Sequence, residues 1–201
     1  MQGKNKEAYD FIIDKDNLYI KEGRSLIYFQ MLGVSLLSLN KIKEFDDLIK
    51  KISQQKYSNL THQQKYLSLL KHYKEKNYTT VITGFESLNK STILTNNSGT
   101  RRVLSDVFYY WRALSFINIG EYQNALKETF RFRPVNNQAS VGYILDHYWP
   151  KKDYLRGMAY EGLGDQLNAR RSYEDFLRVW KNADNTLPEI IDTKQRLEKI
   201  R

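Results

Sequence analysis

The 201-residue sequence contains no cysteine, which excludes disulfide bonds, thiolate metal sites and a cysteine nucleophile. Its three prolines and ten glycines leave long helices with few interruptions. No apolar run approaches the ~20 residues that a membrane-spanning helix requires. The N-terminal segment MQGKNKEAYDF has no apolar stretch behind its lysines, unlike a secretory signal. We therefore expect a cytoplasmic protein without a membrane span, or a periplasmic one if an upstream signal has been removed.

Acidic residues are scarce in the second quarter of the chain. The net charge is +9, and residues 51–100 hold seven basic residues against two acidic ones. A basic surface can attract nucleic acid. The lysines that would form such a surface are Lys65, Lys71, Lys74 and Lys76. Because no zinc ligands or arginine–glycine tract accompany the charge, we favour a solvated lysine-rich face.

A pattern of small and aromatic residues recurs every 44 residues. The segments IGEYQNALKETF and LGDQLNARRSYEDF align with Gly120 opposite Gly164. One further step back, KNYTTVITGFESL places Lys76 at the same position, and a weaker copy around Gly33 precedes it at an interval of 36 residues. Internal repetition of this kind is typical of solenoid folds.

Each copy predicts two helices joined by a tight bend. Apolar residues recur at steps of three and four on both sides of the bend, and Gly120 or Gly164 at the bend allows the left-handed conformation that ends a helix. Small residues stand where the two helices would cross most closely: Ala113, Ala125, Gly157 and Ala169. A single hairpin cannot bury its apolar face alone, so we expect the copies to stack.

These positions resemble the tetratricopeptide repeat, whose usual period is about 34 residues. The matching residues are Ala113, Phe116, Gly120, Tyr122 and Ala125 in one copy, and Gly157, Tyr160, Gly164 and Ala169 in the next. The closing proline of the motif is out of place, since Pro134 comes early, and roughly ten extra residues per unit fall in segments 89–100 and 133–152. The resemblance covers residues 24 to 181.

The resemblance implies an all-α fold: a right-handed α–α superhelix of about four helical hairpins in one domain over residues 1–201. The expected hairpins are 22–54, 60–89, 101–133 and 151–181. Residues 186–201, with Pro188 near their start, are expected to form a capping helix. Residues 1–20 are either a partial repeat, in which case the native protein extends upstream, or an N-terminal cap.

The sequence has no constellation of residues that predicts catalysis. The three histidines lack metal-ligand spacing, and His72 aligns with Phe116 and Tyr160, so we expect it to be a packed core ring. There is no glycine-rich phosphate loop and no nucleophile motif. We therefore predict a protein that is not an enzyme, with no catalytic residue, metal or cofactor.

The resemblance implies that the first helix of each hairpin lines a concave face. Three sets of residues share one position each along these helices: Tyr66, Tyr110 and Tyr154; Leu70, Leu114 and Met158; and Tyr73, Ile117 and Glu161. A ladder of tyrosines could offer flat apolar area and hydroxyl groups to a peptide. The alternative is that the rings fill gaps between neighbouring hairpins.

The function expected from this arrangement is a non-enzymatic scaffold that holds a protein or peptide partner on its concave face. One alternative is a regulatory C-terminal repeat domain of a longer signalling or transcription-regulator protein. The other is the nucleic-acid-binding surface described above.

Overall fold

The computed structural model describes residues 6–7, 9–10, 25–54, 58–93, 98–132, 148–183 and 185–200. Within these residues every regular element is an α-helix and no strand occurs, which confirms the all-α prediction. The chain divides into two compact units, Met1–Asn77 and Tyr78–Arg201, which are described separately. The right-handed superhelix and the single domain stay predictions. Residues 6–7 and 9–10 are helical, and the rest of the expected N-terminal segment 1–20 lies outside the described residues.

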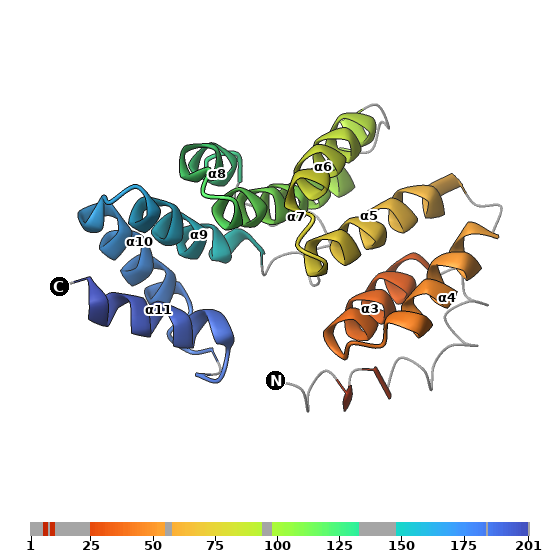
Figure 1. The fold of residues 1–201 in the computed structure, drawn as a ribbon, viewed down its shortest axis with the longest axis horizontal. Coiled ribbons are helices and arrows are strands. Elements are labelled where there is room, and N and C mark those ends of the chain that lie inside the picture. The colour runs from red at the N-terminus through yellow and green to blue at the C-terminus, as the bar shows by residue number, and fades with distance from the viewer. Residues whose placement is uncertain are drawn as a thin grey trace. The chain divides into compact units, whose positions relative to one another are not determined.

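In the described part of the first unit, three long helices surround a small core. They are α3 (Ser25–Ser38), α4 (Ile42–Ser53) and α5 (Ser58–Lys74). Helices α3 and α4 form a hairpin, and α5 packs against both (Figure 1). On α4 the spacing of Phe45, Leu48 and Ile52 places all three on one buried face. Gly33 lets α3 approach α5, because a Cβ atom there would lie 2.5 Å from Cδ2 of Leu67.

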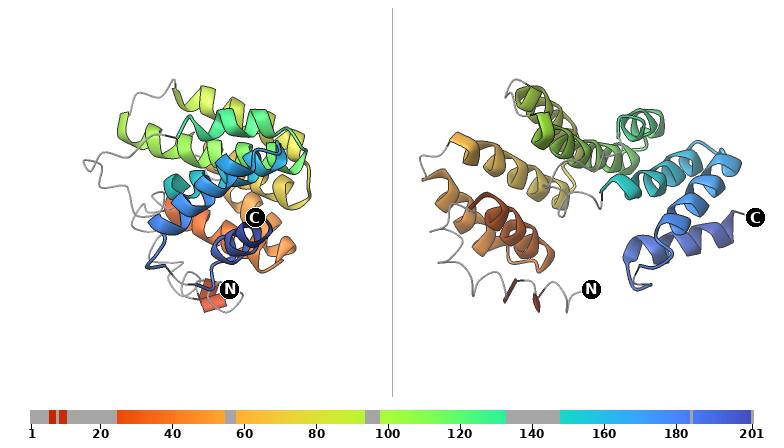
Figure 2. Two further views of the ribbon diagram at one scale, coloured as in Figure 1. Left: turned by 90° about the vertical axis from the view of Figure 1, so that its left-hand side faces the viewer. Right: turned by 180° about the vertical axis from the view of Figure 1, so that it is seen from behind.

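The second unit is a chain of six described helices. They are α6 (Tyr78–Ile93), α7 (Ser98–Asn118), α8 (Tyr122–Thr129), α9 (Tyr148–Gly162), α10 (Gln166–Val179) and α11 (Pro188–Lys199). Helix α7 packs against α6, α8 and α9; α9 also packs against α8 and α10; and α11 packs against α10. Figure 2 shows that the chain reverses its direction from α9 to α10 and again from α10 to α11. The core between α9 and α10 contains Leu155, Tyr173 and Phe176, which are almost fully buried.

The same turn geometry occurs four times along the chain. Asn40, Lys76, Gly120 and Gly164 have φ of 58°, 62°, 80° and 77°. In every case the amide of the next residue donates to a carbonyl five residues before it at 2.9 Å, as from Glu121 to Phe116 and from Asp165 to Tyr160. In a second bond, the amide of the left-handed residue itself donates to the carbonyl three residues before it. Together the two bonds define the Schellman motif that ends a helix. The spacings of 36, 44 and 44 residues match the sequence alignment, so the predicted bends at Gly120 and Gly164 are confirmed.

The small residues predicted at the helix crossings of the second unit are buried. Ala113, Ala125 and Ala169 have no exposed surface. A Cβ atom on Gly157 would lie 2.3 Å from ring carbons of Tyr173, so a larger residue would separate α9 from α10. The close packing of α9 on α10 therefore depends on a residue without a side chain.

Helix α11 has the amphipathic character expected of a capping helix. It begins with Pro188 in its first turn, where Glu189 also places an acidic group. Ile190 and Thr193 are buried. Apart from Pro188 and Ile191, its exposed positions are polar: Lys194, Gln195, Glu198 and Lys199.

Candidate protein-interaction surface

The structure brings six of the nine predicted partner-binding residues together. Tyr110, Leu114 and Ile117 follow each other at helical spacing on α7, as do Tyr154, Met158 and Glu161 on α9, and α7 packs against α9. The remaining three lie on α5 in the other unit: Tyr66, Leu70 and Tyr73.

The three tyrosines of the predicted ladder are buried. Tyr66, Tyr110 and Tyr154 have exposures of 5%, 7% and 9%. The Tyr154 ring lies 5.5 Å from that of Phe176, and its hydroxyl donates to Oδ2 of Asp192 at 2.7 Å. Rings with so little surface pack within the fold, as in the alternative interpretation, and Leu70 is also buried. Partner binding through these four residues stays a prediction.

Partly exposed apolar side chains lie beside the buried rings. Leu114 and Ile117 on α7 and Met158 on α9 are half-buried and pack against one core. We call these three residues the apolar strip. It combines surface that a partner can reach with positions set by a rigid core, which is how binding residues are usually held.

A polar network joins α9 and α10 to α11. Oε2 of Glu161 accepts hydrogen bonds from the Tyr173 hydroxyl at 2.7 Å and from Nη1 of Arg196 at 2.8 Å. Nε of Arg196 also donates to Oδ2 of Asp192 at 2.6 Å, the atom that accepts from Tyr154. At the start of α9, Nζ of Lys151 lies 2.6 Å from Oε1 of Glu189. We call these seven residues, Lys151, Tyr154, Glu161, Tyr173, Glu189, Asp192 and Arg196, the α9–α11 network.

The protonation states suit these contacts. Burial, reinforced by the hydrogen bond to Asp192, raises the pKa of Tyr154. Burial and the bond to Glu161 raise the pKa of Tyr173 in the same way. Burial works against the charge of Arg196, but hydrogen bonds to Asp192 and Glu161 outweigh it and raise its pKa. Both phenols therefore stay neutral donors and the guanidinium stays charged near neutral pH.

Sequence reasoning placed Glu161 on the first-helix face but missed this network. The signal was present: Glu161 is a charged residue at a position held by Tyr73 and Ile117 in the other copies. Its partner Arg196 lies 35 residues further along the chain, outside the 44-residue register. No pattern within the repeats points to it.

A second group of charges lies where α6, α7 and α8 meet, and two of its three members are buried. Nη1 of Arg112 lies 3.2 Å from Oε2 of Glu128, and Nη2 lies 3.6 Å from Oε2 of Glu86. Burial raises the pKa of Glu128, against the attraction of Arg112 and Arg131. The side chains of Arg112 and Glu128 are each 7% exposed, whereas that of Glu86 is 44% exposed. Because the buried pair joins α7 to α8, we assign it to the fold and not to a binding site.

The prediction that His72 is a core ring is wrong. Its side chain is 42% exposed, and Nδ1 lies 3.6 Å from Oε2 of Glu75 and 3.5 Å from Nδ2 of Asn77. The residue stands in the last turn of α5 beside the Schellman turn, where polar groups face it. Among the described residues, no group of three or more histidine, cysteine, aspartate or glutamate side chains could hold a metal ion.

The four lysines considered for nucleic-acid binding, which we call the basic block, have different roles. Nζ of Lys71 lies 2.6 Å from Oδ1 of Asp46, and Nζ of Lys74 donates to the carbonyl of Leu37. Lys65 and Lys76 are exposed. Two of the four lysines therefore hold the first unit together. None of the helices in the described part of the chain is long and apolar enough to cross a membrane.

No protein-family model, curated protein or solved structure matches this chain. The likeness to the tetratricopeptide repeat therefore depends on the residues and turns of the chain itself.

Proposed function

We propose that this chain is a non-enzymatic interaction module with a tetratricopeptide-like architecture, which holds a protein or peptide partner against the apolar strip of its second unit. The observation that carries the proposal is the fourfold recurrence of one turn at spacings of 36, 44 and 44 residues. Repeated helical hairpins form extended surfaces whose side chains are fixed in advance. Such a surface binds at a lower ordering cost than a flexible one.

The apolar strip supports this proposal better than the tyrosine ladder does. Leu114, Ile117 and Met158 keep exposed surface, whereas Tyr110 and Tyr154 are buried. A partner with an apolar segment would cover the strip without rearranging the core.

A nucleic-acid-binding function has weaker support. Lys71 and Lys74, half of the basic block considered above, are engaged within the first unit. Polyanion binding through this block would weaken steeply between low and moderate salt.

A pull-down with matched variants tests the proposal. The Leu114→Ala/Met158→Ala variant removes apolar area from the strip. The Val179→Ala/Ile191→Ala control removes two side chains that are 47% and 44% exposed elsewhere in the same unit. We expect the strip variant to lose a specific partner that the wild type and the control both capture. Equal capture by all three proteins, with helix content unchanged by circular dichroism, would contradict the proposal.

A further inference from the structure

Helix α11 contacts the rest of the second unit through a face that is partly apolar and partly charged. Ile190 and, just after the helix, Ile200 are buried at 2% and 6% exposure. On the same helix, Glu189, Asp192 and Arg196 reach Lys151, Tyr154 and Glu161 of α9. Steps of three and four residues put the three charged groups on one face. The surface of α9 and α10 beneath α11 thus accommodates an amphipathic helix, and we call this surface the seat.

Part of the polar network in this seat is open to water. The Arg196 side chain is 27% exposed and that of Glu161 is 32% exposed, so solvent competes for their hydrogen bonds. The core of the α9–α10 hairpin is better protected, since Tyr173 and Phe176 have 0% and 1% exposure. Elements held by few buried groups open locally while the remaining structure stays folded.

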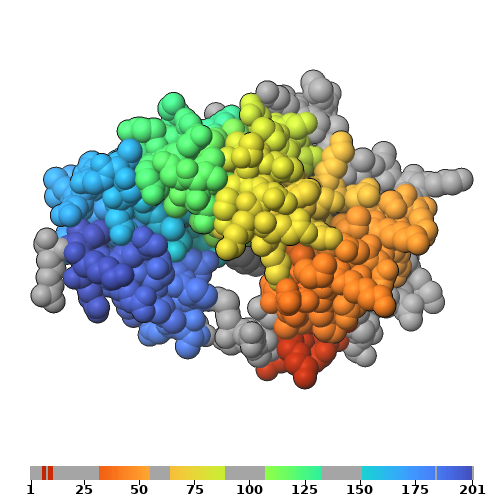
Figure 3. Space-filling model, in the orientation of Figure 1, coloured from red at the N-terminus to blue at the C-terminus, as the bar shows by residue number. Residues whose placement is uncertain are grey.

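The connection to α11 allows such an opening. After α10 ends at Val179, the described residues between Trp180 and Leu187 form turns and bends with no helix. Helix α11 can therefore leave its seat without disturbing the backbone hydrogen bonds of α10, although the bond from the Arg170 side chain to the carbonyl of Ile200 would break. Figure 3 shows α11 in dark blue on the surface of this unit, next to α10.

We propose that α11 is an internal ligand, and that its seat on α9 and α10 also binds an amphipathic helix of a partner with the same chemistry. That chemistry is a carboxylate at positions i and i+3, an arginine at i+7, and an isoleucine at i+1, as in Glu189, Asp192, Arg196 and Ile190. The inference rests on the proposed interaction function and gives it a second surface on the same unit, which α11 occupies until a partner helix replaces it. A tethered helix competes at an effective concentration in the millimolar range, so weakening α11 raises the apparent affinity for any helix in trans.

A peptide titration tests the proposal on the full chain. The probe is a synthetic peptide of residues 185–201 with a fluorophore at its N-terminus. We expect it to bind the Asp192→Ala/Arg196→Ala variant at least ten times more tightly than the wild type, because the variant's own helix competes less well. The matched control, Gln195→Ala/Lys199→Ala on the exposed face of α11, should bind the peptide as the wild type does. Equal binding by the three proteins, or no binding to any, would overturn the proposal.

Hydrogen exchange without peptide gives an independent readout. In the Asp192→Ala/Arg196→Ala variant, amides of α11 should exchange at least tenfold faster than in the wild type, while those of α9 and α10 keep their rates. Equal acceleration in all three helices would mean that α11 opens only with the whole unit, and the internal-ligand proposal would be lost. Neither experiment needs a partner. A failed pull-down, combined with the expected peptide binding and hydrogen exchange, would therefore reject only the proposed function.

Discussion

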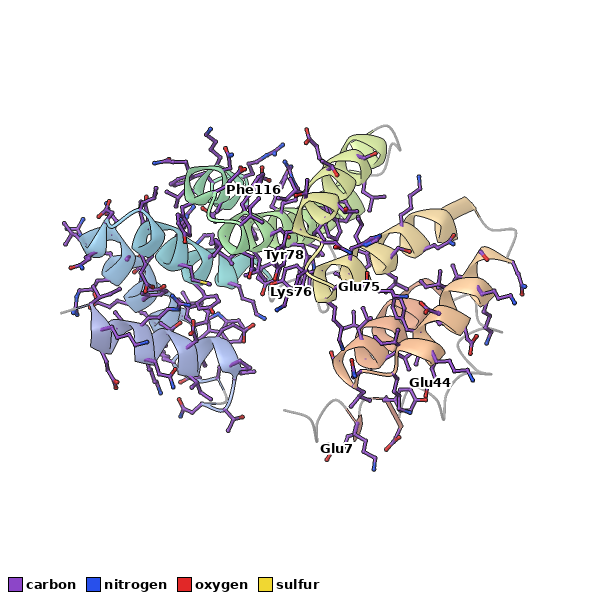
Figure 4. The ribbon with its side chains drawn as sticks, in the orientation of Figure 1. Glu7, Glu44, Glu75, Lys76, Tyr78 and Phe116 are labelled. Atoms are coloured by element: carbon purple, nitrogen blue, oxygen red, sulfur yellow. The ribbon has the colours of Figure 1, made fainter. Side chains whose placement is uncertain are left out.

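Left-handed residues end helices at four places, and only two of them are glycines. Asn40 tolerates this conformation because its short polar side chain can bond locally. Lys76 has a Cβ atom and no such compensation, although its φ of 62° matches the others. Figure 4 shows Lys76 beside Glu75 at the turn that follows α5.

Replacing Lys76 with glycine should stabilise the protein. A non-glycine residue in this region costs roughly 1–2 kcal/mol, and the greater freedom of glycine in the unfolded chain offsets part of the gain. We expect Lys76→Gly to raise the free energy of unfolding in urea by about 0.5–1 kcal/mol. The control is Gly120→Ala, where no atom lies within 4 Å of the added Cβ, so that φ alone acts. It should lower stability, and a stabilising Gly120→Ala would contradict the assignment of this turn.

A substitution at Gly157 gives the most sensitive test of the close packing between α9 and α10. The methyl group of Gly157→Ala would lie 2.3 Å from ring carbons of Tyr173, and overpacking of this kind costs about 1–3 kcal/mol. Alanine is also the better helix former by roughly 1 kcal/mol, so a net loss of stability requires that the clash dominate. We expect that loss in thermal unfolding, and we expect Tyr173→Leu to cost less in the Gly157→Ala background than in the wild type. Additive effects would argue against the close approach.

The sequence predicted conformation at single residues better than it predicted exposure. Gly120 and Gly164 stand at one position of a repeated pattern, and the left-handed turn follows from that position alone. The register also placed Tyr110 and Tyr154 on one face of their helices, but register does not say what covers that face. Tyr154 is covered partly through Asp192, 38 residues away, and this contact belongs to no repeat. His72 aligned with aromatic residues, yet its polar neighbours in the turn decided its exposure.

At the scale of elements, buried charge fixes how α6, α7 and α8 meet. Arg112 and Glu128 are each 7% exposed at the side chain, and removing one partner of a buried pair costs about 3–5 kcal/mol. We expect Arg112→Ala to lower the free energy of unfolding by that amount. Arg156 is its equivalent in the next copy and is more exposed, at 22% against 7%, so Arg156→Ala should cost less than Arg112→Ala. Equal losses in denaturant titrations would show that burial does not set the cost.

A paired replacement separates the charge from the packing at this junction. The Arg112→Met/Glu128→Leu double variant removes both ions and keeps similar volumes. Because apolar substitutes for buried pairs are often neutral or stabilising, it should be more stable than Arg112→Ala. A double variant as unstable as the single one would mean that the pair supplies more than the cost of burying charge.

The start of α10 should respond to pH through its capping residue. The carboxylate of Asp165 accepts hydrogen bonds from Nδ2 and the backbone amide of Asn168 at 2.7 and 3.1 Å, and these bonds lower the pKa of Asp165. Since the folded-state pKa lies below the ordinary value near ~4, the stabilisation is present above that value and is lost as pH falls through the folded-state pKa. We expect the stability difference between wild type and Asp165→Ala to shrink on acidification below about pH 4. The Asp165→Asn variant keeps a capping side chain without a titrating group, so its difference from Asp165→Ala should vary less with pH.

For the whole molecule, helix-forming segments could be read from the sequence because apolar spacing and turn residues agree at each copy. The division between Asn77 and Tyr78 could not, since it falls inside the predicted hairpin 60–89, whose pattern resembles the others. The attachment of α11 was equally hidden, because it depends on side-chain pairs between segments of different register.

The central claim is that one helical hairpin is repeated along the chain, with its turn residues at Asn40, Lys76, Gly120 and Gly164. NMR measurement of backbone shifts and of amide–α-proton couplings in the full chain tests this directly. The account predicts positive φ at all four residues, with helix on both sides of each. Negative φ at Gly120 or Gly164, or extended backbone in the segments that flank them, would contradict it.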